Sequence, residues 1–209
     1  RGITGSDYVG LMWFDNFFNN IYFWRLLSNT FTISALSIVF GFPAPIILAL
    51  LLNEIQNEKF KRIVQTITYM PYFISLVVTC SIITIYCQEN GLFSQIIEIF
   101  GGTRRNLLID SGAYRPIYVL SGIWQNIGWN SIIYLAALMN VDPELNEAAQ
   151  IDGANRWQQF RHITVTYLIP TLSVVLVLVV KQGLMVFDYV KAMTGGGPGT
   201  ATQSIALLI

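Results

Sequence analysis

Long apolar runs limit what this chain can fold into more than any other feature of the sequence. At 1.5 Å of rise per residue, about 20 helical residues cross the roughly 30 Å hydrocarbon core of a bilayer. Charged residues make up 11% of the chain, whereas soluble domains carry about 25%. We predict an all-α integral membrane protein with a single domain over residues 1–209. Its four complete transmembrane helices and the start of a fifth are residues 26–52, 63–87, 117–139, 165–187 and 201–209.

Prolines and polar segments divide these runs. Pro43, Pro45 and Pro71 lie within predicted spans, where each removes a backbone donor and is expected to kink its helix. Residues 53–62 are expected to form a tight charged loop, and residues 92–100 a short amphipathic helix lying on the bilayer. The chain begins without a methionine and stops within an apolar run, so we expect it to be part of a longer protein.

Composition and spacing argue against several functions. A formal net charge of zero differs from the basic patch that nucleic acid requires, so no nucleic-acid partner is expected. Cys80 and Cys87 are about 10 Å apart along a helix, too far for a disulfide. The single histidine, His162, belongs to no cluster with zinc spacing. The glycine-rich turn 195–199 lacks the lysine of a phosphate-binding loop. We therefore expect no metal site, no nucleotide site and no catalytic residue in this chain.

The alternation of the spans and the density of basic residues predict an orientation. The connections 53–62 and 141–164 fall on one side and together hold five Lys and Arg in 34 residues. Residues 1–25, 88–115 and 190–200 fall on the other side and hold six in 64 residues. Because Lys and Arg are enriched in cytoplasmic loops, the segment 141–164 is predicted to be cytoplasmic.

The polar segment 141–164 carries the signals of a helix-turn-helix. Asp142 followed by Pro143 starts a helix, and Gly153 permits the backbone conformation in which a helix ends. A second short helix with aromatic residues follows, and the whole segment is expected to lie parallel to the bilayer. The alternative is an ordinary amphipathic loop at the membrane interface. The residues expected to face a partner are Glu147, Ala148, Ala149, Asp152, Gly153 and Ala154.

Several motifs together resemble a known transport family. The run Glu147-Ala148-Ala149, followed by Asp152-Gly153-Ala154, is similar to the EAA loop of binding-protein-dependent ABC importer permeases. The resemblance covers about residues 26–209 and is closest to the permeases for polysaccharide fragments and oligosaccharides. The chain departs from the family pattern at Val165-Thr166, where Leu-Pro is frequent, and at Tyr72, where this branch often has histidine. The other motifs are Phe42-Pro43-Ala44-Pro45, Asn53-Glu54, Phe60-Lys61-Arg62, residues 69–75 and 128–138, Phe160, Ile163, Pro170 and the turn 195–199.

This resemblance implies a fold, a location and a set of partners. It implies the type I ABC importer permease fold in the bacterial cytoplasmic membrane, with the EAA segment as a coupling helix that docks on an ATP-binding subunit. The expected partners are the lipid bilayer, a second homologous permease in a heterodimer, two ATP-binding subunits and an extracytoplasmic solute-binding protein. No cofactor is expected on this chain, since ATP and Mg²⁺ would bind to the partner subunits.

Polar and aromatic side chains within the spans are candidates for a sugar pathway, which needs hydrogen-bonding groups shielded from lipid. The polar residues of the third span recur at steps of four, but such residues also join helices in membranes, and both roles stay open. Lys181 reaches the outer interface, pairs with Asp188, or lines a polar cavity suited to a carboxylate-bearing sugar such as a uronate. The candidate pathway residues are Tyr72, Asn126, Trp129, Asn130, Tyr134, Lys181 and Gln182.

The sequence therefore predicts the transmembrane subunit of an ATP-driven importer for an oligosaccharide or a related sugar. An importer for another solute, such as an amino acid, a peptide or phosphate, is the alternative within the same class. Two other classes are a membrane-embedded enzyme, which should place acidic or histidine clusters near the interface, and a passive channel, which would transport without nucleotide.

Overall fold

The computed structural model describes residues 10–183 and Met193, and in this part the chain forms helices and turns but no strand, as expected for an all-α protein. The expected turn at 195–199, the run 201–209 and the last residues of the span 165–187 lie outside the described residues. The elements in chain order are α1 (Met12–Phe18), α2 (Phe23–Gly41), α3 (Pro43–Glu54), α4 (Glu58–Tyr69), the 3₁₀ turn η2 (Met70–Phe73), α5 (Leu76–Cys87), α6 (Leu92–Ile99), α7 (Ser111–Met139), α8 (Pro143–Ile151), α9 (Arg156–Gln159), the π-turn η3 (Phe160–Thr164) and α10 (Val165–Gly183).

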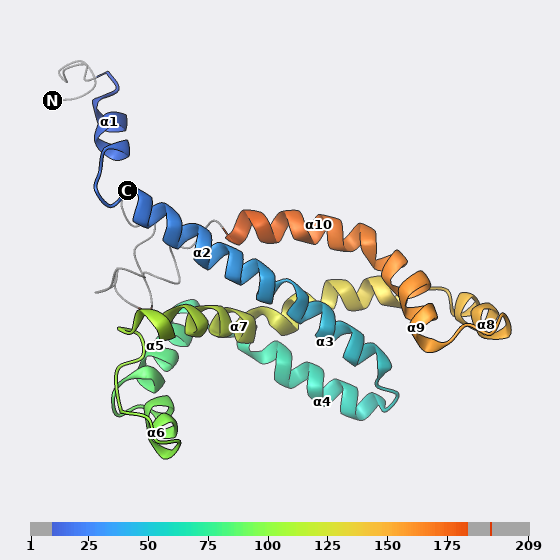
Figure 1. Ribbon diagram of the computed structural model, residues 1–209. Coiled ribbons are helices and arrows are strands. Elements are labelled where there is room, and N and C mark those ends of the chain that lie inside the picture. The colour runs from blue at the N-terminus through green and yellow to red at the C-terminus, as the bar shows by residue number, and fades with distance from the viewer. Residues whose placement is uncertain (1–9, 184–192, 194–209) are drawn as a thin grey trace.

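The helices break at Pro43 and Pro71, two of the three prolines expected to kink them, whereas α3 runs through Pro45 without interruption. Pro43 occupies the first turn of α3, so α2 ends at Gly41 and α3 continues the same run after it (Figure 1). At Pro71 the interruption is larger than a kink, because α4 ends in a 3₁₀ turn and α5 starts afresh. The Ser75 hydroxyl accepts a hydrogen bond from the Val78 N–H at 3.3 Å and caps the new helix. The run 63–87 is therefore two helices rather than one bent helix.

The expected loop 53–62 is shorter than predicted. Asn57 accepts hydrogen bonds from the N–H groups of Lys59 and Phe60, at 3.1 and 3.2 Å. Because this cap satisfies two of the first free donors of a helix, α4 begins at Glu58, and only residues 55–57 connect it to α3. The prediction of a loop through 62 was wrong for this reason.

Three helical stretches of the described chain are long and apolar enough to cross a membrane: Phe23–Glu54, Leu76–Ile99 and Arg156–Lys181. The helix α7 is 29 residues long but carries more polar side chains. It contacts α2, α3, α4, α10 and η2, so it is the central helix of the bundle. The assignment of the individual spans stays a prediction.

Two hydrophobic clusters hold the bundle together, one near the end of α7 and one near its start. One joins α3, α7 and α10 and contains Ala49, Leu52, Tyr134, Leu135, Leu138 and Leu168. The other contains both cysteines, which are free and buried as the sequence predicted, and consists of Ile33, Cys80, Ile83, Cys87, Leu107, Leu108, Tyr114 and Met193.

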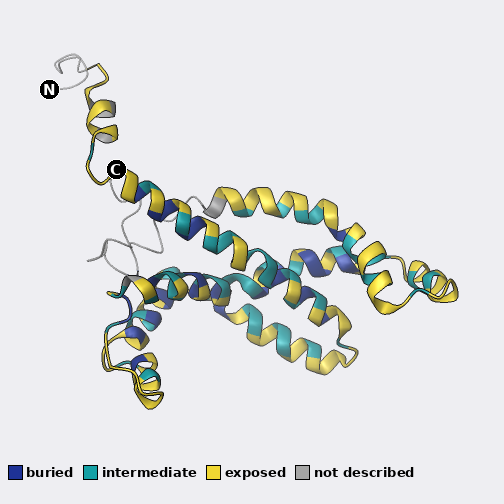
Figure 2. Ribbon diagram, in the orientation of Figure 1, coloured by how far each residue is buried: buried dark blue, intermediate teal, exposed yellow. Residues whose placement is uncertain are grey.

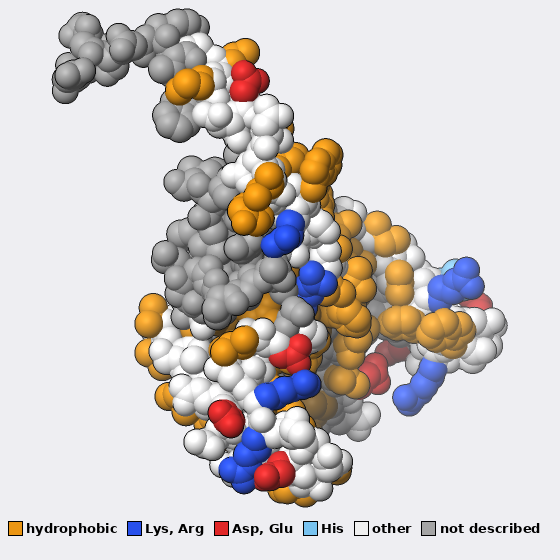
Figure 3. All heavy atoms as spheres, turned by 60° about the vertical axis from the view of Figure 1, so that its left-hand side comes forward, with side chains coloured by type: hydrophobic (Ala, Val, Ile, Leu, Met, Phe, Trp, Pro, Cys, Tyr) orange, Lys and Arg blue, Asp and Glu red, His pale blue; other side chains and the backbone are white. Residues whose placement is uncertain are grey.

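The surface outside these clusters is largely apolar. Figure 2 shows that buried residues concentrate where α7 meets its neighbours, whereas the outer sides of α2, α4 and α10 are exposed. Figure 3 shows hydrophobic side chains over much of the visible face, with acidic and basic side chains at several separate places on it. An apolar surface of this extent suits helices that face lipid along their length.

Candidate functional site

The segment expected to meet a partner protrudes from one end of the bundle (Figure 1). Residues 142–164, called the ledge below, comprise α8, α9 and η3, and none of these elements contains a buried residue. Two large apolar side chains on it are highly exposed, Ile151 at 87% and Trp157 at 67%. A helix that buries no face within its own chain gains little stability from packing, so the shape of the ledge must be fixed locally.

Caps fix both ends of α8. Asp142 accepts a hydrogen bond from the Glu144 N–H at 3.0 Å, and Pro143 follows it in the first turn, as predicted. At the other end Gly153 has φ +78°. Its N–H donates to the Gln150 carbonyl at 3.0 Å, and the next N–H, of Ala154, donates to the Ala149 carbonyl at 2.8 Å. This pair of bonds is the Schellman motif, which requires a left-handed residue where this chain has glycine.

A second set of side-chain bonds starts α9 directly after this turn. Asn155 and Gln158 form a capping box in which each side chain accepts from the other residue's backbone N–H, at 2.9 and 2.8 Å. The Gln159 side chain donates to the Ala154 carbonyl at 2.8 Å. The ring of Trp157 stacks on Phe160 with centroids 5.5 Å apart. The turn between α8 and α9 is thus closed by hydrogen bonds on both sides.

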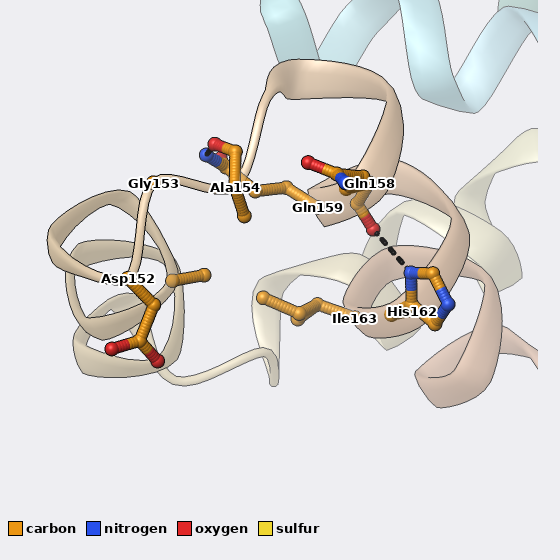
Figure 4. Close-up of a pocket in the computed structure, with 8 residues that line it drawn as sticks. Asp152, Gly153, Ala154, Gln158, Gln159, His162 and Ile163 are labelled. Atoms are coloured by element: carbon orange, nitrogen blue, oxygen red, sulfur yellow. Dashed lines mark hydrogen bonds between the residues drawn. The ribbon is translucent and has the colours of Figure 1, made fainter.

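The ledge encloses a shallow cavity of about 320 Å³ between its two helices. Figure 4 shows Asp152 on the α8 side, and Gln158 and His162 on the α9 side, where His162 Nδ1 lies 3.0 Å from the Gln158 carbonyl oxygen. Ala149, Gly153, Ala154, Gln159 and Ile163 complete its lining. Of the residues predicted to face a partner, four line this cavity, while Glu147 and Ala148 are exposed on α8.

Two predicted pathway residues come together at the middle of α7. Tyr72, on η2, and Trp129, on α7, stack with ring centroids 4.6 Å apart and planes 4° from parallel. Phe73 meets the Trp129 ring edge-on at 5.8 Å. Tyr72 and Trp129 are 39% and 40% exposed, so one side of this aromatic pair is open. Tyr72, at which the chain departs from the family pattern, therefore takes part in a packed contact.

The remaining candidates of the third span lie in different surroundings. Asn126 donates to the Gly122 carbonyl of its own helix at 2.9 Å and is half-buried, as is Asn130. Tyr134 is 1% exposed and lies in the cluster that joins α3, α7 and α10. Of the two roles left open for these third-span residues, pathway or packing, Tyr134 has the packing role within this chain.

The two candidates on α10 lie at its end. Lys181 is exposed, and the side chain of Gln182 lies outside the described residues. The described part of the chain holds no group of three His, Cys, Asp or Glu side chains positioned for a metal ion. The pathway roles of all seven residues stay predictions.

Two residues that were not among the predicted site residues hold α7 in place. Gln125 is buried and donates to the Ile74 carbonyl at 3.2 Å and to the Thr79 hydroxyl at 3.3 Å, which ties α7 to the break between η2 and α5. Gly128 lies so close to α4 that a Cβ there would overlap the backbone carbonyl of Thr68. A polar residue and a glycine at a spacing of three within an apolar helix are the signals that mark this contact.

Comparison with known proteins identifies the family. Residues 41–207, which include the ledge and the whole of α7, match the family described as "Binding-protein-dependent transport system inner membrane component". The chain belongs to this family. The predicted membrane location and the type I permease fold are thereby confirmed, and the chain is a transport permease subunit.

The chain is similar to two curated proteins of Bacillus subtilis, one of them named for polysaccharide transport. It is 43% identical over 184 residues to the polygalacturonan/rhamnogalacturonan transport system permease protein YteP of Bacillus subtilis, covering 88% of this chain and 57% of the relative. It is 40% identical to protein LplB of Bacillus subtilis, covering 92% and 61%. The chain thus spans about three fifths of these curated relatives.

Solved structures agree with this assignment. The permease superposes with a TM-score of 0.89, at 37% identity, on a chain of a bacterial ABC transporter involved in the import of the acidic polysaccharide alginate. The match covers 98% of this chain and 72% of that one. A second structure, with a TM-score of 0.85 and 38% identity over 94% of this chain, is that of a bacterial alginate ABC transporter in complex with an alginate pentasaccharide-bound periplasmic protein.

Proposed function

We propose that this permease is a transmembrane subunit of an ATP-driven importer that moves an oligosaccharide or a related sugar across the cytoplasmic membrane. The proposal is supported by the family, by relatives named for polygalacturonan and rhamnogalacturonan transport, and by the similarity to an alginate importer. The solute-binding partner is likewise supported by an alginate transporter solved with a periplasmic protein.

The ledge is the observation that carries the proposal. Its helices are fixed by an N-cap, a Schellman motif and a capping box, yet they bury no residue against the rest of the chain. A surface that is locally rigid and exposes Ile151 and Trp157 needs another protein to cover it. We assign this surface to an ATP-binding subunit, with Glu147, Ala148, Ala149, Asp152, Gly153 and Ala154 in contact with it.

The proposed mechanism uses the connection between the ledge and the bundle. ATP and Mg²⁺ are bound by the partner subunits, whose closure supplies the force. This chain contributes the backbone that runs without a break from α9 through η3 into α10, so that a displaced ledge tilts α10 against α7. Access to the pathway then changes from the outer to the inner side because the two conformations differ in their affinity for the partners.

The pathway itself is assigned to the side chains around the open aromatic pair on α7 and η2. An aromatic face and nearby amides suit a sugar ring, which presents both apolar C–H groups and hydroxyls. The proposed pathway residues there are Tyr72, Asn126, Trp129 and Asn130. Lys181 and Gln182, at the end of α10, are proposed to lie further along the same path, and Tyr134, which packs in the core of this chain, is proposed only to support it from behind. A second, homologous permease in a heterodimer would supply the other wall.

Charge reversal on the ledge tests this function. In the full complex in proteoliposomes, Glu147→Lys is expected to lower ATP-dependent sugar uptake more than tenfold. The reason is that it replaces a negative charge with a positive one inside a desolvated interface. The matched control is Glu58→Lys, an exposed glutamate on α4 with the same change of charge and on the same predicted side of the membrane.

Three outcomes would contradict the proposal. Unchanged uptake with Glu147→Lys would remove the ledge from the coupling path. Uptake by the intact complex without ATP would identify a channel. Uptake of an amino acid, a peptide or phosphate in place of every sugar tested would establish the alternative importer class.

A further inference from the structure

One arginine of the bundle forms no ion pair with any residue that the structure describes. Arg115 lies in the first turns of α7, directly before Pro116 and the predicted span 117–139. Its side chain is half-buried, and one terminal nitrogen, Nη2, donates to the Asn29 side-chain oxygen on α2 at 3.1 Å. Its Nε is buried and has no hydrogen-bond acceptor. Within residues 10–183, the one side chain that this guanidinium is seen to bond is therefore a neutral amide.

The neighbouring arginines of the same connection differ. Arg104 forms an ion pair with Glu98 at 2.6 Å, and the hydrogen bond that Arg104 donates to this carboxylate raises the pKa of Arg104. Arg105 forms an ion pair with Asp110 at 3.1 Å. In the described chain Arg115 takes part in no ion pair, although it is the most enclosed of the three.

A charge in this position is costly to maintain. Arginine stays protonated at all accessible pH values, and burying it without a counter-charge is unfavourable. Its five donors form a rigid fork that matches a carboxylate, and Asn29, itself buried, holds one arm of that fork. An ionisable group at the margin of a membrane span that lacks a partner marks a functional position.

We propose that Arg115 recognises the carboxylate of an acidic sugar, such as a uronate unit, as the sugar enters the permease from the outer side. The inference rests on the proposed role in sugar import and narrows its substrate class to anionic oligosaccharides. Residues 88–115 fall on the outer side in the predicted topology, so Arg115 stands where the external connection passes into α7. The incoming carboxylate supplies a negative charge that no described residue brings to Arg115.

Paired sugars that differ only in charge test this assignment. Uptake of trigalacturonate and of its methyl ester is measured with the complete importer and its unaltered solute-binding protein in proteoliposomes. Arg115→Gln keeps a donor for Asn29 but removes the charge. It is expected to lower trigalacturonate uptake about tenfold or more, the effect of losing a hydrogen bond to a charged group, and to leave uptake of the ester unchanged.

Two further variants separate recognition from structure. Arg115→Lys keeps the charge and should retain more trigalacturonate uptake than Arg115→Gln. Arg105→Gln removes an arginine that Asp110 already neutralises, and should leave both uptakes at the unaltered level.

The remaining outcomes overturn the inference in distinguishable ways. An equal loss of both uptakes in Arg115→Gln would mean that Arg115 only joins α7 to α2. Unchanged trigalacturonate uptake would remove it from recognition altogether. If the unaltered importer moves neutral sugars but not trigalacturonate, the inference fails and the proposed function stands. If it moves no sugar at all, the proposed function fails as well.

Discussion

The ledge and the contact between α4 and α7 hold their shape by opposite means. The ledge is closed by backbone and cap hydrogen bonds between residues close in sequence, and its side chains stay exposed. At the other contact, Gly128 lets two helices approach until backbone meets backbone, across 60 residues of chain. Local bonding leaves side chains available for a partner, whereas close packing consumes them within the bundle.

The two regions therefore differ in the amino-acid substitutions that they can tolerate. A substitution on the ledge should alter coupling while the protein still folds, because no packed core depends on it. A substitution at the packed contact should remove folded protein before any effect on transport can be measured.

The largest effect is expected for Gly128→Val. A side chain at this position overlaps the Thr68 carbonyl, so α4 and α7 must separate at a cost of about 3 kcal/mol or more. We expect the yield of monodisperse protein in detergent to fall and its thermal unfolding temperature to drop. The control is Gly122→Ala. Gly122 lies on the same helix as Gly128, but a Cβ at this position would have no described neighbour within 4 Å outside its own helix backbone. Equal stability of the two variants would contradict the close contact.

An intermediate effect is expected for Gly153→Val. A β-branched residue at φ +78° strains the turn between α8 and α9 by about 1–2 kcal/mol and displaces the ledge. ATP-coupled uptake should fall sharply while the amount of permease in the membrane stays normal. Gly153→Asn, which tolerates this backbone conformation, should keep most of the uptake. Full activity of the valine variant would show that the turn geometry is not needed for coupling.

The smallest effect is expected for Asn155→Ala. Removing the capping box costs about 1 kcal/mol, but Gln159 still bonds to the Ala154 carbonyl and keeps α9 near its place. Hydrogen exchange of the α9 amides should accelerate, with uptake reduced less than in Gly153→Val. A complete loss of uptake would mean that Asn155 itself contacts a partner.

The sequence predicted the ledge well because its signals are local. Asp142, Pro143 and Gly153 each act on the turn of backbone in which they lie, and the structure uses all three as expected. A local signal also explains the error at residues 53–62. Asn57 is a helix cap that the prediction of a loop did not take into account, and the charged segment after it is helical.

Contacts between distant residues were harder to foresee. The bond from Arg115 to Asn29 joins positions 86 residues apart, and the approach of Gly128 to Thr68 depends on how two helices cross. The periodicity of a span shows which residues share a face, but it does not say whether that face meets a helix, a sugar or lipid. Tyr134 and Trp129 illustrate this limit, because both lie on α7 and both were predicted to line the pathway, yet Tyr134 is buried in the core and Trp129 is half exposed.

The unbroken path from α9 through η3 to α10 has a mechanical consequence. Residues Arg156–Lys181 form a 26-residue helical stretch, which makes a rod about 39 Å long. A rod pivoting by about 5° near its ledge end carries its far end through roughly 3 Å, so under the proposed mechanism a small displacement of the ledge would move the far end of α10 by several ångströms. The hydrogen-bond ladder of this stretch is altered at two places, the π-helical turn at Phe160–Thr164 and Pro170, which has no backbone donor. In the proposed mechanism these two positions set how far the rod bends instead of swinging.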